Sequence, residues 1–269
     1  MEKGKVVIAM RTREYPYPIY VAWTSGVEDW EAIQIIEGVK KMLEAAKYEA
    51  RFVIFGSSPW TEDEDYASVD WYQSRSIIGN QIDTERMDIL LAQEPWRKTD
   101  HLDLMIVDQD IEARRVGCSF CLAYTSNKNW IVFSVYRFRG ISSYEKGLKT
   151  VAAHEFGHIL GLVDPLRVTA DRRGGHHAGH CANELCVMNQ VESGVHAVKL
   201  GKELEKNHRF LCHDCTRELF GIKEIRPLPK STKPPVKVRP KIRVYPSKKK
   251  LIIVTPRRRD PIVVRPQKK

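Results

Sequence analysis

The sequence predicts a mixed α/β fold: a twisted sheet with helices packed on it, one helix that carries a metal-binding motif, and an extended tail. Two observations predict the folded part. Apolar runs of strand length alternate with segments of helical periodicity over residues 5–138. A histidine motif then lies inside a further helical segment, directly after the last of these runs. A change in composition after residue 221 predicts the tail.

The expected helices and strands follow from the spacing of apolar residues. Asp29–Ala46 places its apolar residues on one helix face and predicts an amphipathic helix, and Asp83–Leu91 predicts a shorter one. Gly56–Gly79 is acidic and turn-rich, so we expect an irregular excursion over the surface. Four apolar runs are expected as strands: Lys5–Met10, Tyr48–Phe55, Leu102–Val107 and Trp130–Phe138.

The motif His154-Glu155-x-x-His158 is the stretch where residue types and spacing together specify chemistry. Histidines four residues apart lie one turn above each other on the same face of a helix. Two neutral imidazoles in that position supply two of the three protein ligands of a catalytic zinc. Glu155 is then placed to act as a general base on a water molecule.

The boundaries of the helix that carries the motif are also predicted. Ser142 and Glu145 fit a capping box, which places the helix start just before the motif. Gly161 follows the last helical residue, where a left-handed backbone conformation costs glycine little. A helix that stops there returns the chain toward the motif.

The chain has no apolar run of membrane-spanning length, and its N-terminal apolar run is too short for a secretory signal. We therefore expect a soluble, cytoplasmic protein. Disulfides are rare in the cytosol, so the six cysteines are expected as thiols or zinc ligands.

The net charge of +10 is concentrated at the C-terminal end. Residues 222–269 hold 17 Lys and Arg against 2 Asp and Glu, a net charge of +15, together with 9 of the 14 prolines. Residues 1–221 have a net charge of −5. We therefore predict a folded domain over residues 1–221 and a largely extended basic tail over 222–269. The tail is either a solvated extension or a binding site for phosphate-rich partners, with nucleic acid favoured over an anionic membrane surface.

Cysteines and a methionine follow the histidine motif in a specific order. The order is His154-Glu155-x-x-His158-x-x-Gly161, then His180-Cys181-x4-Cys186-x-Met188, then Cys212-x-x-Cys215. This pattern resembles the archaemetzincins, a family of zinc metallopeptidase-like proteins of the metzincin type, over Lys5 to about Leu219. The resemblance implies a metzincin-like sheet with an active-site helix, one catalytic zinc, and a second, structural zinc that pins the C-terminal segment.

The resemblance leaves the third ligand of the catalytic zinc open between Asp164 and His180. Asp164 has the family's spacing from His158, and a carboxylate can bind zinc. His180 follows an insertion but keeps the family's adjacency to Cys181. We favour His180, because a zinc site at Cys181 would hold it near the helix whatever the intervening loop does.

The second zinc is expected at Cys181, Cys186, Cys212 and Cys215. Two closely spaced thiolate pairs can converge tetrahedrally on one ion, and the resemblance implies the same set. Cys118 and Cys121 have no further pair to complete four ligands, so we expect buried thiols at a strand edge, with a redox pair as the alternative. Met188 resembles the Met-turn methionine that packs below the metal in metzincins.

Motif and resemblance together imply zinc-dependent hydrolysis of a peptide or protein substrate. His154, His158 and His180 would hold the catalytic zinc, with Glu155 as general base. The resemblance also implies an edge strand beside the active-site helix, and Trp130–Phe138 is expected to pair there with an extended substrate. The alternative is a non-hydrolytic zinc protein that acts on nucleic acid through the basic tail. The intact Glu155 favours the peptidase, because a purely structural site needs no general base.

Overall fold

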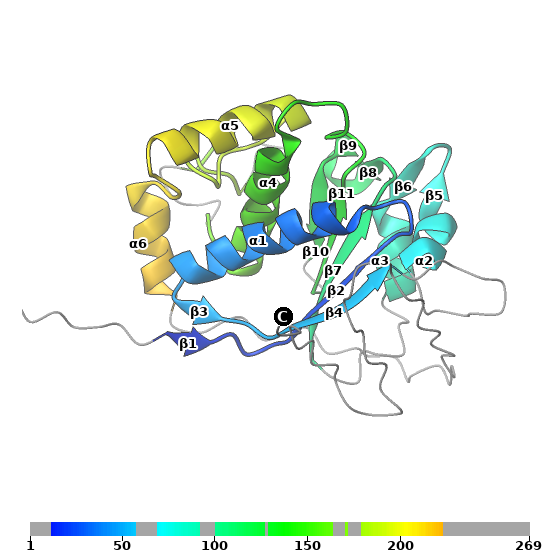
Figure 1. Cartoon of the computed structure of the whole chain (residues 1–269), viewed down its shortest axis with the longest axis horizontal. Helices are drawn as coiled ribbons and strands as arrows, with labels where there is room; N and C mark the ends of the chain where they lie inside the picture. The colour runs from blue at the N-terminus through cyan, green and yellow to red at the C-terminus, as the bar shows by residue number, and fades with distance from the viewer. Residues whose placement is uncertain are drawn as a thin grey trace, which may run out of the picture.

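The computed structural model describes residues 12–57, 69–91, 100–126, 129–163, 170–171 and 179–222. Within these residues the chain has a mixed α/β fold with a five-stranded sheet, a four-stranded sheet, a two-stranded sheet and six α-helices (Figure 1). The predicted fold class is confirmed. The predicted strand Lys5–Met10 and the tail from residue 223 lie outside the described residues.

The five-stranded sheet has the strand order β10-β11-β7-β2-β4. Its members are β2 (Ile19–Trp23), β4 (Phe52–Ser57), β7 (Leu102–Val107), β10 (Ala123–Ser126) and β11 (Trp130–Ser134). β10 runs antiparallel to β11, and all other neighbours are parallel. Strand β7 has the bounds predicted from its apolar run and lies in the middle of the sheet.

Helices cover both faces of this sheet. Four of them are α1 (Asp29–Ala45), α2 (Val69–Ser76), α3 (Thr84–Leu91) and α4 (Tyr144–Ile159). α1 and α4 pack together against one face, and α2 and α3 lie on the other (Figure 1). Alternation along β7 divides the two cores: Leu104 and Ile106 belong to the first, and Met105 and Val107 to the second. Because both faces are covered, the strand is apolar almost throughout.

The remaining elements lie around this core. The two-stranded sheet pairs β1 (Arg13–Glu14) with β3 (Tyr48–Glu49). The four-stranded sheet has the order β5 (Ile77–Ile78), β6 (Gln81–Asp83), β8 (Ile111–Ala113) and β9 (Cys118–Cys121). A 3-10 turn at Arg114–Val116 joins β8 to β9, and the described chain ends with α5 (Gly194–Lys206) and α6 (His213–Gly221). No helix among the described residues has the length and apolar character needed to cross a bilayer.

Helices α1 and α3 match the predicted segments, but one predicted strand is divided in two and one central strand was missed. The run Tyr48–Phe55 forms two strands rather than one, because the chain changes partner: β3 pairs with β1, and β4 pairs with β2. Strand β2 was not predicted, although it lies between β7 and β4. Prolines at positions 16 and 18 precede it and obscure its apolar run, since proline there indicates a turn.

The predicted irregular excursion Gly56–Gly79 is also wrong in part. Its last third forms helix α2, in which Trp71 and Tyr72 are buried against the second core. The apolar area of these two aromatic rings outweighs the polar residues that flank them in the helix. Residues 58–68 of the excursion lie outside the described residues.

The strand expected over Trp130–Phe138 is shorter than predicted and is not at the edge of the sheet. It ends at Ser134, where the Tyr136 backbone N–H donates to the Ser134 hydroxyl and the chain turns. β10, which was not predicted, pairs along its outer side and forms the edge. β10, rather than β11, is therefore the edge strand on this side of the sheet.

Candidate metal centres

The histidine motif lies on α4, which packs between α1 and α5. Gly161 has a φ of +81°, so the left-handed turn predicted after the helix is present. The predicted capping box at the other end is wrong. Ser143 precedes the helix with a φ of 62°, and its backbone oxygen, not its side chain, accepts the Lys146 N–H at 3.2 Å.

Three histidines, here called the histidine cluster, converge at the end of α4: His154, His158 and His180. Each offers one ring nitrogen, and these atoms all lie within 4.8 Å of one another. The Nε2 atoms of His154 and His158 are 3.0 Å apart. Two nitrogens bound to one tetrahedral zinc at about 2.1 Å lie about 3.4 Å apart, so the cluster fits a zinc ion.

The environment of the cluster favours the neutral imidazoles that bind metals. His154 Nδ1 lies 2.8 Å from the Val187 backbone oxygen. A carbonyl oxygen only accepts, so Nδ1 carries the proton and Nε2 keeps its lone pair for a metal. Burial lowers the pKa of His154 to about 4. Burial, together with repulsion from His154 and His180, also holds the pKa of His158 well below its usual value.

Backbone pairing on either side of His180 holds it beside the helix. Its ring stacks on His154 with centroids 5.0 Å apart. Its backbone oxygen accepts the Asp171 N–H at 2.7 Å, and the next residue, Cys181, donates its N–H to the Met188 oxygen at 2.8 Å. Asp164, the alternative third ligand, lies outside the described residues.

Glu155 lies at the start of the motif and is buried with His154. Its carboxylate accepts a hydrogen bond from the Thr125 hydroxyl on β10, with an oxygen–oxygen distance of 2.5 Å. Burial raises the pKa of Glu155 to about 7, and the Thr125 hydrogen bond opposes that shift. A carboxyl group with a pKa near 7 is suited to take up and release a proton at neutral pH.

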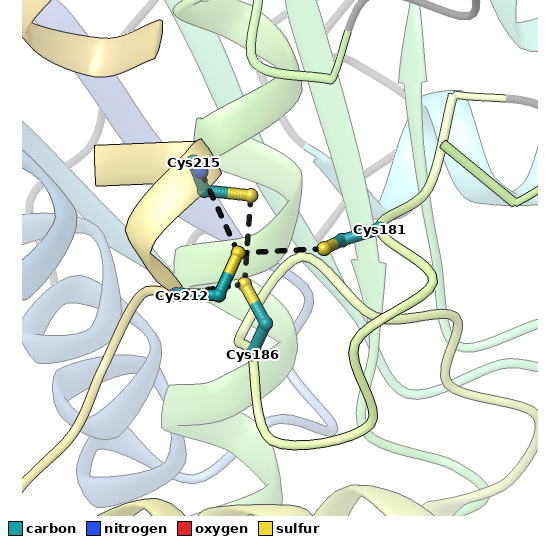
Figure 2. Close-up of side chains that lie close together, drawn as sticks. All are labelled: Cys181, Cys186, Cys212 and Cys215. Atoms are coloured by element: carbon teal, nitrogen blue, oxygen red, sulfur yellow. Dashed lines mark hydrogen bonds between the residues drawn. The ribbon is translucent and has the colours of Figure 1, made fainter. Parts of the chain in front are cut away.

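Four cysteines, here called the cysteine cluster, form a second group in which all ligand atoms lie within 4.8 Å of one another: Cys181, Cys186, Cys212 and Cys215 (Figure 2). All four are buried. The sulfurs of Cys181 and Cys212 are 3.6 Å apart, and those of Cys186 and Cys215 are 3.5 Å apart. Sulfurs bound to one tetrahedral zinc at about 2.3 Å lie about 3.8 Å apart, so this cluster also fits zinc.

Backbone N–H groups surround the sulfurs of the cysteine cluster. Asn183 donates to Cys181, and Cys212 donates to Cys186, each at 3.4 Å. Cys212 caps α6 by accepting the Cys215 N–H at 3.5 Å. Such donors stabilise thiolates, the form that binds a metal. Hydrogen bonds within the cluster, first from Cys186, lower the pKa of Cys181 to about 2.

Met188 packs against Gly157, which lies on α4 between the two histidines of the motif. Met188 is fully buried. A Cβ atom on Gly157, one residue before His158, would lie 2.3 Å from the Met188 sulfur. The methionine therefore packs directly against the α4 backbone below the motif, and any larger residue at 157 would displace it.

Cys118 and Cys121 belong to neither cluster. Both lie on β9, the outer strand of the four-stranded sheet. The prediction that they are buried is wrong, since both are half-buried free thiols.

Two groups that position the site were not found from the sequence: Thr125 and the Val187 carbonyl. Thr125 lies on a four-residue strand far from the motif in sequence, and a lone threonine gives no spacing signal. The Val187 carbonyl is a backbone atom, so residue identity carries no information about it. Only the folded chain brings both to the motif.

Comparisons with known proteins give a distant structural likeness. No protein-family model matches the chain, and no curated protein matches it. Among solved structures it is similar to an archaemetzincin from Methanopyrus kandleri, with a TM-score of 0.48 and 16% sequence identity over 79% of this chain and 97% of that chain. The function of this chain is therefore inferred from its own residues.

Proposed function

We propose that this chain is a zinc-dependent peptidase in which the histidine cluster holds the catalytic zinc and Glu155 is the general base. One observation carries the proposal: three histidine nitrogens converge within 4.8 Å of one another, and Glu155, next to His154 on the same helix, is buried with its carboxylate held by Thr125. A structural zinc site has no use for such a carboxylate. The resemblance of the motif to the archaemetzincins supports the same reaction class.

The residues around the histidine cluster have separate roles in the proposed peptide hydrolysis. Zinc bound by three protein ligands keeps one position open, lowers the pKa of a water molecule to about 7 and polarises a carbonyl group. Glu155 takes the proton of the attacking water and delivers it to the leaving amine. Thr125 holds the carboxylate of Glu155, and the Val187 carbonyl holds the ring of His154.

Strand β10 is the surface we propose for an extended peptide substrate. It is the edge of the five-stranded sheet beside α4 and carries Thr125 next to Glu155. An edge strand has backbone N–H and C=O groups that can pair with an added strand. A peptide paired there would lie across the histidine cluster.

The cysteine cluster is proposed as a structural zinc site, which gives two zinc ions per chain. Four buried thiolate donors leave no position for substrate. The nucleic-acid alternative rests on the tail from residue 223, outside the described residues, and stays a prediction, as does the cytoplasmic location.

The proposal is tested by zinc content and peptide cleavage in the same preparations. We expect two zinc ions in the wild type and cleavage of an unstructured peptide library. A chelator should abolish cleavage and added zinc should restore it. His158→Ala should retain one zinc and cleave nothing. Equal cleavage by His158→Ala and wild type would show that the activity does not come from this site.

A further inference from the structure

The cysteines of β9 lie in an irregular part of the four-stranded sheet. Ala113 of β8 is opposite Cys118, and Ile111 is opposite Cys121. Two steps along β8 therefore match three steps along β9, and the pairing carries a β-bulge at this point. Residues directly opposite each other point to the same face, and Ile111 and Ala113 share a face. The bulge thus places both thiols on one face of the sheet.

The surroundings of the two thiols make them chemically unequal. A hydrogen bond from Cys121 is the main cause that lowers the pKa of Cys118 to about 7, and the charge of Arg137 adds to it against burial and the charge of Asp110. The pKa of Cys121 is raised, mainly by the same hydrogen bond. Burial and the charges of Cys118, Glu155 and Asp110 add to this shift.

A salt bridge fixes the cation beside this pair. Arg137 donates to both carboxylate oxygens of Asp110, at 2.7 and 2.6 Å. Its guanidinium lies 3.8 Å from the centroid of the Phe120 ring, between the two cysteines in sequence. The salt bridge anchors Arg137 at Asp110, and the ring contact holds its positive charge against β9, where it stabilises a thiolate.

We propose that Cys118 and Cys121 are a redox-active dithiol that a small-molecule disulfide, such as oxidised glutathione, converts to an intramolecular disulfide. The Cys118 thiolate attacks one sulfur of the oxidant and expels one thiolate. Cys121 loses its proton and attacks the Cys118 sulfur of the mixed disulfide, which expels the second thiolate. The protein loses two electrons and two protons, and the oxidant becomes two thiols.

This reactivity is separate from the proposed peptidase and from both metal clusters. Neither thiol belongs to a metal-binding group among the described residues. Zinc-bound sulfurs of the cysteine cluster are buried and already coordinated in the loaded protein, so they should react far more slowly. The dithiol can therefore be tested whether or not the chain cleaves peptides.

The test uses the full, zinc-loaded chain incubated with oxidised glutathione at neutral pH, followed by intact mass and peptide mapping. The wild type should lose two hydrogen atoms, located in the tryptic peptide Val116–Lys128, with its zinc content unchanged. Cys121→Ser should stop at one glutathione on Cys118, because no second thiol can expel it. Cys118→Ser should react at least about tenfold more slowly, because burial and the charges of Glu155 and Asp110 still raise the pKa of Cys121 and leave little thiolate.

Two outcomes would overturn the proposal. A wild-type product that keeps glutathione on Cys118 would show that the thiols cannot meet. Reaction of the double variant Cys118→Ser/Cys121→Ser at the wild-type rate would show that the oxidised thiols are those of the cysteine cluster.

Discussion

The cysteine cluster and the histidine cluster fit the same ion but differ in access. The cysteine cluster has four donors, all buried, and joins α6 to the segment that follows α4. The histidine cluster has three donors, and His158 and His180 are only half-buried. A closed set of four holds the chain together, whereas an open set of three leaves a position for a reactant.

The two clusters are joined by one peptide bond, between His180 and Cys181. The cysteine cluster fixes the backbone at Cys181, and that backbone places the His180 ring against His154. The cysteine cluster therefore supports the geometry of the histidine cluster.

The largest expected effect comes from breaking the closed cluster. Cys212→Ser should remove the structural zinc and lower the free energy of unfolding by more than about 4 kcal/mol, because metal loss is among the most destabilising changes. Denaturant unfolding with zinc analysis measures both. Cys118→Ser is the matched control and should keep two zinc ions and nearly the wild-type stability. A Cys212→Ser variant that keeps two zinc ions would contradict the cluster.

A second prediction separates the clusters by changing one residue of the open one. His180→Ala should lose the catalytic zinc and peptide cleavage but keep the structural zinc and most of the stability. Asp164→Ala should keep two zinc ions and most of the activity. The reverse pattern, with zinc lost from Asp164→Ala, would make Asp164 the third ligand.

A third prediction concerns the hydrogen bond to the general base. Thr125→Val keeps the shape of the side chain but removes the hydroxyl that donates a hydrogen bond to the Glu155 carboxylate. We expect kcat to fall about tenfold or more with little change in KM and no loss of zinc, since hydrogen bonds to charged groups contribute about 1.5–3 kcal/mol. Thr125→Ser should restore most of the rate. An unchanged kcat in Thr125→Val would remove the positioning role.

The smallest expected effect is that of removing the tail. Ile222 is partly buried against the main core, so the cut is placed after it, and residues 223–269 are deleted. We expect both zinc ions, the melting temperature and peptide cleavage to be kept, because the tail's composition supplies no core of its own. Nucleic-acid binding by the full chain should weaken steeply with added salt and vanish on truncation. Equal binding by the truncated chain would place the site on the folded domain.

The parts of the fold that the sequence predicted are those with a strong local pattern. α1 and β7 were predicted because helical spacing and an unbroken apolar run decide the element locally. β2 and β10 were missed because their neighbours in the sheet, rather than their own short sequences, decide that they are strands. The edge role of β11 was taken from the family resemblance, whereas strand order is a property of the whole sheet and places β10 outside β11.

The candidate site was predicted where residue type carries the chemistry. The two motif histidines follow from spacing, and the four cysteines follow from paired spacing together with the family resemblance; the folded chain brings each set together. Spacing alone could not decide between His180 and Asp164, because Asp164 keeps the family's spacing from His158 whereas His180 keeps the family's adjacency to Cys181. Thr125 and the Val187 carbonyl required the fold, since one is a common residue and the other a backbone atom.

The central claim is that the open cluster is catalytic and the closed one is not. Glu155→Gln tests it most directly, because glutamine keeps the size of the side chain and removes the base. We expect two zinc ions in the variant, wild-type stability within about 1 kcal/mol, and peptide cleavage reduced by about a hundredfold or more. Peptide cleavage at the wild-type rate with both zinc ions bound would contradict it.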